Sequence, residues 1–95
     1  MNTNEEIVCG FDSLRDFVGR ALKAVRMARL TRLELSKALR LDFGLSQATE
    51  QWILIVEDAK FHLLFEEFEI LCKALSFSPE EVLLYARELK EKNAG

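Results

Sequence analysis

Apolar residues recur at intervals of three and four along most of this chain, which is the spacing of helices with one buried face. Only one proline and four glycines interrupt a sequence that is 49% hydrophobic. The continuously apolar segment 52–56 could also be a buried strand, but the length of its flanks favours a helix. The 95 residues therefore predict an all-α protein with one core, with residues 1–10 as a flexible tail and residues 11–92 as the domain.

Helix-boundary signals divide this domain into five helices. Asp12 or Ser13 can cap a first helix that ends near residue 28, and Thr31 forms a capping box with Glu34 for the second. The third helix contains the apolar segment 52–56, and the fourth spans about residues 63–75. Residues 78–81 read Ser-Pro-Glu-Glu, which is the pattern of an N-cap followed by a helix start, so the last helix runs from there to about residue 92.

Charge is distributed unevenly along the sequence, although the net charge is −3. Residues 15–40 hold eight basic and two acidic side chains, whereas the remainder holds five basic and fourteen acidic ones. A basic face on an acidic body is what a phosphate backbone would bind. The alternative is a helical surface whose charges serve only solvation.

In order and in most spacings, these helices resemble the helix-turn-helix domain of phage-repressor and Xre-type regulators. The resemblance covers roughly residues 17–85. It implies a five-helix lambda-repressor-like fold, with the third helix presented to the major groove of DNA. The residues that carry it are Leu30–Leu39, Ile53, Val56, Glu57, Lys60, Leu64, Phe68, Leu71, Cys72, Ala74, Leu75 and Ser78–Val82.

The turn before the third helix departs from this family by about seven extra residues, Asp42–Ala48. A helix-turn-helix ordinarily joins its two helices with three or four residues. Either the loop is longer, or the third helix begins a turn earlier with Ser46 as its cap. We expect a combination, in which Gly44 makes the turn and Ser46 caps the helix.

The resemblance also implies which side chains would touch DNA. Glutamine suits adenine and glutamate can accept from the cytosine amino group, so the start of the third helix supplies the candidates for base contacts. These candidates are Gln47, Thr49, Glu50 and Gln51. Basic side chains near the second helix would hold phosphates and fix the register. They are Arg26, Arg29, Arg32 and Lys60.

Several large apolar residues lie beside the predicted helical stripes rather than on them, which indicates a second buried surface. A homodimer related by a two-fold axis would cover it. The residues expected at that interface are Trp52, Leu54, Ile55, Phe61 and Phe65. The predicted function is therefore a homodimeric, sequence-specific DNA-binding transcriptional regulator. The alternative is a protein-interaction module, antirepressor or antitoxin-like, that keeps the fold without binding double-stranded DNA.

Catalytic and metal-binding patterns find little support in the sequence. His62 has no nucleophile placed beside it, and Cys9 and Cys72 are too far apart for a structural zinc motif. We therefore expect no enzyme activity and no metal or cofactor. Neither a signal peptide nor a long apolar segment is present, so a soluble, cytoplasmic protein without membrane contact is expected.

Overall fold

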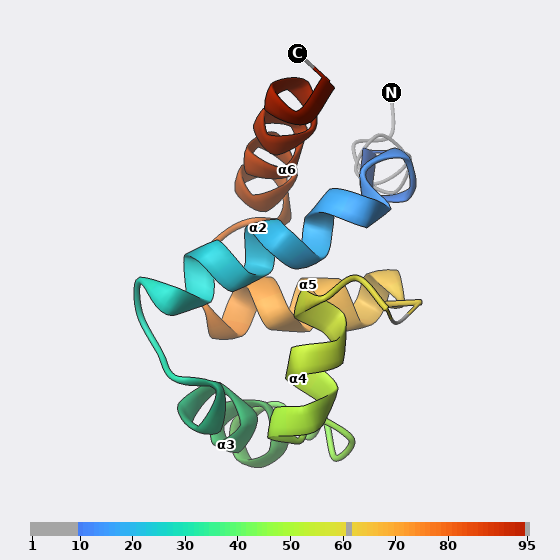
Figure 1. Cartoon of the computed structure of the whole chain (residues 1–95). Coiled ribbons are helices and arrows are strands. Elements are labelled where there is room, and N and C mark those ends of the chain that lie inside the picture. The colour runs from blue at the N-terminus through green and yellow to red at the C-terminus, as the bar shows by residue number, and fades with distance from the viewer. Residues whose placement is uncertain (1–9, 61, 95) are drawn as a thin grey trace.

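The computed structural model describes residues 10–60 and 62–94, and every regular element within them is a helix (Figure 1). A helical turn at residues 10–13 precedes the first long helix. The prediction of an all-α chain is confirmed. The helices are α2 (Arg15–Met27), α3 (Arg32–Asp42), α4 (Glu50–Glu57), α5 (Phe65–Ala74) and α6 (Pro79–Ala94).

The helices are arranged around one core, with α6 at one end of the molecule and α3 at the other (Figure 1). Helix α2 packs against both α6 and α4, and α3 packs against α4 and α5. Aromatic contacts join the first helical turn to α5, since the Phe11 and Phe68 rings lie 4.9 Å apart between centroids. Fully buried core residues include Phe11, Val18, Leu35, Leu39, Ile53, Phe68, Leu75 and Val82.

Two of the predicted helix starts are confirmed by their side-chain hydrogen bonds. The Thr31 hydroxyl accepts from the Glu34 backbone N–H, and the Glu34 carboxylate accepts from the Thr31 N–H. Ser78 and Glu81 form the same reciprocal pair at the start of α6. These two capping boxes could be predicted because each consists of two residues only three positions apart.

The start of α2 was predicted wrongly. Its N-cap is Leu14, which makes no side-chain capping hydrogen bond. Ser13 instead donates its hydroxyl to the Gly10 carbonyl, and Asp12 forms an ion pair with Arg15. The preceding turn at residues 10–13 already supplies backbone partners, since the Leu14 N–H donates to the Gly10 carbonyl. Gly10 therefore belongs to the helical domain, whereas residues 1–9 of the predicted tail lie outside the described residues.

The extra residues between α3 and α4 form a longer loop, so the prediction that Ser46 caps the third helix was wrong. Thr49 is the N-cap of α4 and accepts from the Trp52 backbone N–H at 3.1 Å. Gly44 makes the turn as expected, with a φ of 68° that glycine adopts without a steric penalty. The loop is held inward by Leu45 and Ala48, which are both buried.

Helices α2 and α4 approach each other closely at Gly19. A side chain at this position would collide with the Val56 carbonyl oxygen and lie 3.1 Å from that of Glu57. Both oxygens belong to backbone, which cannot rotate away as a flexible side chain would. The absence of a Cβ at Gly19 is therefore what allows α4 to cross α2 at this distance.

Gly19→Ala should destabilise the protein by about 1–3 kcal/mol, because the added methyl group forces the two helices apart. Gly10→Ala is the matched control, since its Cβ would make only an ordinary 3.6 Å contact with Leu83. Chemical denaturation monitored by circular dichroism measures both variants. Equal stability of the two variants would contradict the close approach of α2 and α4.

Leu71→Ala and Leu75→Ala should each destabilise the protein by about 2–4 kcal/mol, because each leaves a cavity in the core. Both side chains are buried against the neighbouring helices. Thermal melts of the two variants test the position of the α5 face. A loss below about 1 kcal/mol in both would show that this face is not packed as described.

Candidate nucleic-acid interface

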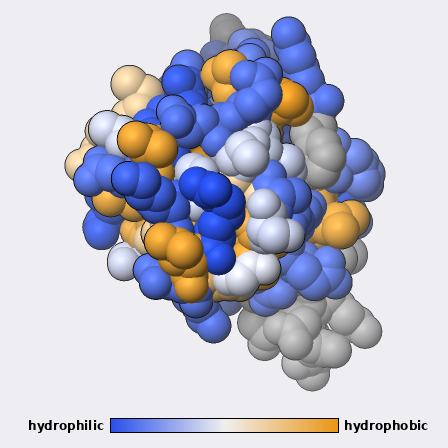
Figure 2. Space-filling model, turned by 90° about the horizontal axis from the view of Figure 1, so that it is seen from below, coloured by the Kyte–Doolittle hydropathy of each residue, from blue (hydrophilic) through white to orange (hydrophobic). Residues whose placement is uncertain are grey.

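The first turn of α4 presents polar side chains to solvent. Thr49, Glu50 and Gln51 are all exposed, and they lie at the end of the molecule formed by α3 and α4. Figure 2 shows the molecule from that end, where hydrophilic residues predominate and hydrophobic ones lie between them. Three of the four residues predicted to contact bases are therefore adjacent and accessible.

Gln47, the fourth predicted base contact, is engaged within the protein. Its side-chain amide donates to the Glu67 carboxylate at 3.0 Å. The other oxygen of Glu67 accepts from the Leu64 backbone N–H at 2.8 Å, so this buried carboxylate joins the loop to the start of α5. Gln47 is exposed, but its amide positions the loop instead of pointing freely outward.

The loop before α4 has a second fixed point on α3. The buried Ser36 hydroxyl donates to the Ala48 carbonyl at 2.6 Å. Nearby, the Leu45 N–H donates to the Leu39 carbonyl at 2.9 Å. Since Ala48 directly precedes the N-cap of α4, these bonds determine where the first turn of α4 lies relative to α3. Apart from its small size, nothing in the sequence indicates this role for Ser36.

A basic hollow lies between the end of α2 and the start of α3. It has a volume of about 570 Å³ and is lined by Lys23, Arg26, Arg29 and Arg32 together with Glu34 and the neighbouring residues Met27, Ala28, Leu30 and Thr31. A hydrogen bond from the Thr31 backbone N–H lowers the pKa of the Glu34 carboxyl, so this carboxylate is ionised at neutral pH. Four cations face two carboxylates, Glu34 and the buried Glu57 that pairs with Arg26 and Arg32, so the hollow keeps an excess of two positive charges and can attract an anion such as phosphate.

Arg26 is buried, contrary to the expectation that it would contact phosphate from the surface. Only 6% of the residue is exposed, and its guanidinium donates to both carboxylate oxygens of Glu57, at 2.5 and 3.3 Å. A further bond runs to the Leu30 carbonyl at 3.0 Å. With its donors committed in this way, Arg26 serves to hold α2 against the end of α4.

Glu57 accepts from a second arginine as well. The Arg32 Nε donates to one Glu57 oxygen at 3.0 Å, and a third of the Arg32 side chain remains exposed. One buried carboxylate thus joins the end of α2, the start of α3 and the end of α4. We call Arg26, Glu57 and Arg32 the arginine–glutamate cluster. Two positive charges share one negative charge in it, so the cluster keeps a net positive charge beside the hollow.

The remaining basic candidates differ in how they are held. Arg29 is exposed and its guanidinium lies 4.5 Å from the centroid of the Phe77 ring. Lys60 is exposed after the end of α4. Lys23, which was not predicted to contact DNA, lines the hollow with Arg29. Its position six residues before Arg29 on the same basic row was the available signal.

The residues predicted to form a dimer interface are less exposed than expected. Trp52, Leu54 and Ile55 are half-buried, and Phe61 lies outside the described residues. Phe65 packs into the aromatic cluster, with its ring centroid 5.5 Å from that of Phe11 and 6.0 Å from that of Phe68. Phe65 therefore contributes to the core, and the large side chains that are clearly exposed lie elsewhere.

The described part of the chain contains no cluster of residues for metal binding and no reactive thiol. Among residues 10–60 and 62–94, no three potential metal ligands lie close enough together to hold an ion. Burial raises the pKa of the Cys72 thiol to about 12, with a further contribution from Glu69, so the thiol is protonated and unreactive at neutral pH. None of the described helices is long and apolar enough to cross a membrane.

Comparisons with protein-family models, curated proteins and solved structures found no match to this chain.

Arg26→Met should destabilise the protein by about 3 kcal/mol or more, because it leaves the buried Glu57 carboxylate with one partner instead of two. Arg87→Met is the matched control, since Arg87 is exposed on α6 and its loss should cost less than about 0.5 kcal/mol. Urea denaturation measures both. If the two variants lose equal stability, the buried ion pair does not hold the helices as described.

Proposed function

We propose that the protein is a DNA-binding transcriptional regulator in which α3 and α4 form a helix-turn-helix. The observation that carries this proposal is the basic hollow between the end of α2 and the start of α3, which comes with an exposed polar first turn on α4. Phosphate oxygens would accept from Lys23, Arg29 and the exposed part of Arg32. Bases would be read from the start of α4, as in other proteins that insert a helix into the major groove.

The dimensions of α4 support insertion into the major groove. An α-helix with its side chains is about 10–12 Å across, which fits the groove's width of about 12 Å, and the eight residues of α4 extend about 12 Å along its axis. The hollow lies near the C-terminal end of α4, because Arg32 bonds to Glu57 there. The polar first turn and the cationic hollow are thus about one groove width apart, so one can face bases while the other meets a phosphate strand.

Base reading falls mainly to Gln51 in this proposal. Its amide can pair with adenine in a bidentate manner, and Glu50 can accept from the amino group of cytosine. Gln47 contributes indirectly, because its bond to Glu67 keeps the loop before α4 in place. Lys60 extends the cationic surface beyond the end of α4.

A second candidate function is a protein-interaction module on the same fold. Glu50 favours this second function, because a carboxylate in the first turn of α4 repels phosphate unless a cytosine amino group donates to it. The exposed apolar side chains on α3 and α6 favour it as well. The two functions differ in their response to salt, since only phosphate contacts release condensed counterions.

Lys23→Gln combined with Arg29→Gln should weaken binding to random duplex DNA and reduce its salt dependence. Two lost phosphate contacts lower the slope of log affinity against log salt by about 1.8. Fluorescence anisotropy with a labelled duplex, measured over a salt series, gives this slope. Circular dichroism melts verify that loss of the Arg29–Phe77 contact has left the fold intact.

Arg87→Gln combined with Lys90→Gln is the control, because it removes the same charge from exposed positions on α6. This control should keep the parent slope. Equal slopes for the two double variants would mean that DNA does not bind at the hollow. An undetectable affinity of the parent protein at low salt would favour the interaction module.

A further inference from the structure

The exposed face of α3 carries leucines that the fold leaves uncovered. Leu33 and Leu41 are 44% and 80% exposed, and Lys37 lies between them on the same face, four residues from each. Arg40 is exposed beside them. This apolar and basic surface, which we call the α3 face, spans about 12 Å along the helix.

A groove of complementary character lies on α6. It has a volume of about 320 Å³, with Leu84 and Tyr85 of α6 on one side and Val25 of α2 and Phe77 on the other. Leu84 and Tyr85 are 57% and 37% exposed. Two carboxylates, Glu81 and Glu88, line the same groove. We call this surface the α6 groove, and it is apolar and acidic.

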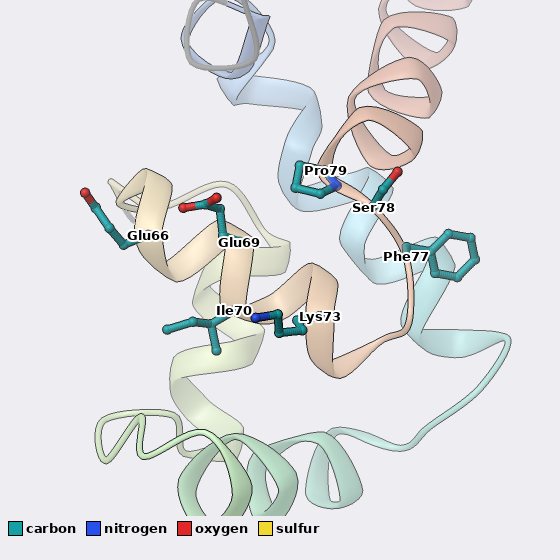
Figure 3. Close-up of a pocket in the computed structure, with 7 residues that line it drawn as sticks. All are labelled: Glu66, Glu69, Ile70, Lys73, Phe77, Ser78 and Pro79. Atoms are coloured by element: carbon teal, nitrogen blue, oxygen red, sulfur yellow. The ribbon is translucent and has the colours of Figure 1, made fainter. Parts of the chain in front are cut away.

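Phe77 lines both this groove and a larger hollow beside it. That neighbouring hollow, of about 510 Å³, is lined by Glu66, Glu69 and Lys73 of α5 together with Ile70, Phe77, Ser78 and Pro79 (Figure 3). Figure 3 shows the Phe77 ring turned away from Glu66, Glu69 and Lys73. The ring thus adds apolar surface to the α6 groove, whereas the neighbouring hollow mixes both charge signs and indicates no single ligand.

Helix α3 lies at one end of the molecule and most of α6 at the other (Figure 1). A chain therefore cannot cover its own groove with its own α3, but a second copy can. The distribution of charge agrees with contact between these two ends. Most of α3 lies in the basic segment 15–40, and α6 lies in the acidic remainder. Opposite fields of this kind favour association of unlike ends and disfavour contact between like ends.

We propose that a second copy of this chain docks its α3 face into the α6 groove, so that copies associate head to tail. Leu33 and Leu41 enter the groove beside Leu84 and Tyr85, while Lys37 meets Glu88 and Arg40 meets Glu81. The two surfaces are of similar length, since residues 33–41 of α3 span about 12 Å and residues 81–88 of α6 about 10 Å. Such an interface is heterologous, and each added copy presents a new free groove.

The α3 face does not overlap the proposed DNA surface, whereas the α6 groove adjoins it at Phe77, over whose ring the Arg29 guanidinium lies. None of the four α3-face residues lines the basic hollow, and none lies in the first turn of α4. The interface also differs from the two-fold dimer through Trp52, Leu54 and Ile55 that the sequence suggested. Those side chains are half-buried, whereas the α3 face and α6 groove hold leucines that are more exposed.

A mixing experiment tests the proposal. The first variant, Leu33→Ser with Leu41→Ser, has a damaged α3 face and an intact groove. The second, Leu84→Ser with Tyr85→Ser, has the opposite defect. Sedimentation velocity up to about 1 mM should show self-association of the parent and monomers of each variant. An equimolar mixture should form complexes of two copies and no larger ones, because a single intact interface remains per pair.

Leu64→Ser is the control, since Leu64 is 52% exposed on a different surface and its loss should leave self-association unchanged. A charge exchange adds a second test. Lys37→Glu and Glu88→Lys should each weaken association at least threefold, and both changes in one chain should restore it.

Three results would overturn the proposal. A monomeric parent at the highest concentration would exclude association. Dissociation by the α6 variant alone would indicate a two-fold contact between α6 helices. Persistent association of both variants would place the interface elsewhere, as at α4. These results are independent of DNA binding, which is measured separately by the salt series.

Discussion

The position of three helices depends on one buried carboxylate. Glu57 accepts from Arg26 and Arg32, so it links the end of α2, the start of α3 and the end of α4. Removing such charges from water costs several kcal/mol per ion, which only close, well-oriented partners can offset. The cluster therefore admits few alternative helix arrangements. Gly19 acts in the same region, because it lets α2 approach α4 closely enough for Arg26 to reach Glu57.

The surface that we propose for DNA follows from this arrangement. With Arg26 committed to Glu57, the cations available to an anion are Lys23, Arg29 and part of Arg32. Ser36 and Glu67 then fix the loop from which α4 begins. The buried cluster and the loop anchors thus determine the separation between the cationic hollow and the first turn of α4. Head-to-tail association uses other residues, on the outer faces of α3 and α6.

Local signals predicted the helices well, because capping depends on residues close in sequence. Thr31 and Ser78 were identified in this way. Ser46 was not distinguishable from Thr49 as a cap, since that choice depends on how Ala48 and Leu45 are held by α3. The prediction for Arg26 failed for a geometric reason. Side chains three residues apart point in directions that differ by about 60° around a helix. A row of basic residues with this spacing therefore turns toward the core, and Arg26 is the residue that becomes buried.

Long-range contacts also decided which apolar residues are exposed. Phe65 packs against the core because the helical turn at residues 10–13 places Phe11 beside it. On α6, Leu84 and part of Tyr85 lie in solvent. A count of apolar residues indicates that the chain has more of them than its core can bury. Only the packing of α2 against α6 shows which of them stay exposed.

The most direct test of the DNA surface is a titration of isotope-labelled protein with duplex DNA, followed by backbone amide chemical shifts. Amides of Lys23, Arg29–Glu34 and Thr49–Gln51 should shift first and most, while those of α6 beyond Leu84 should stay unchanged. Shifts centred on α6, with the start of α4 unaffected, would contradict the proposed surface.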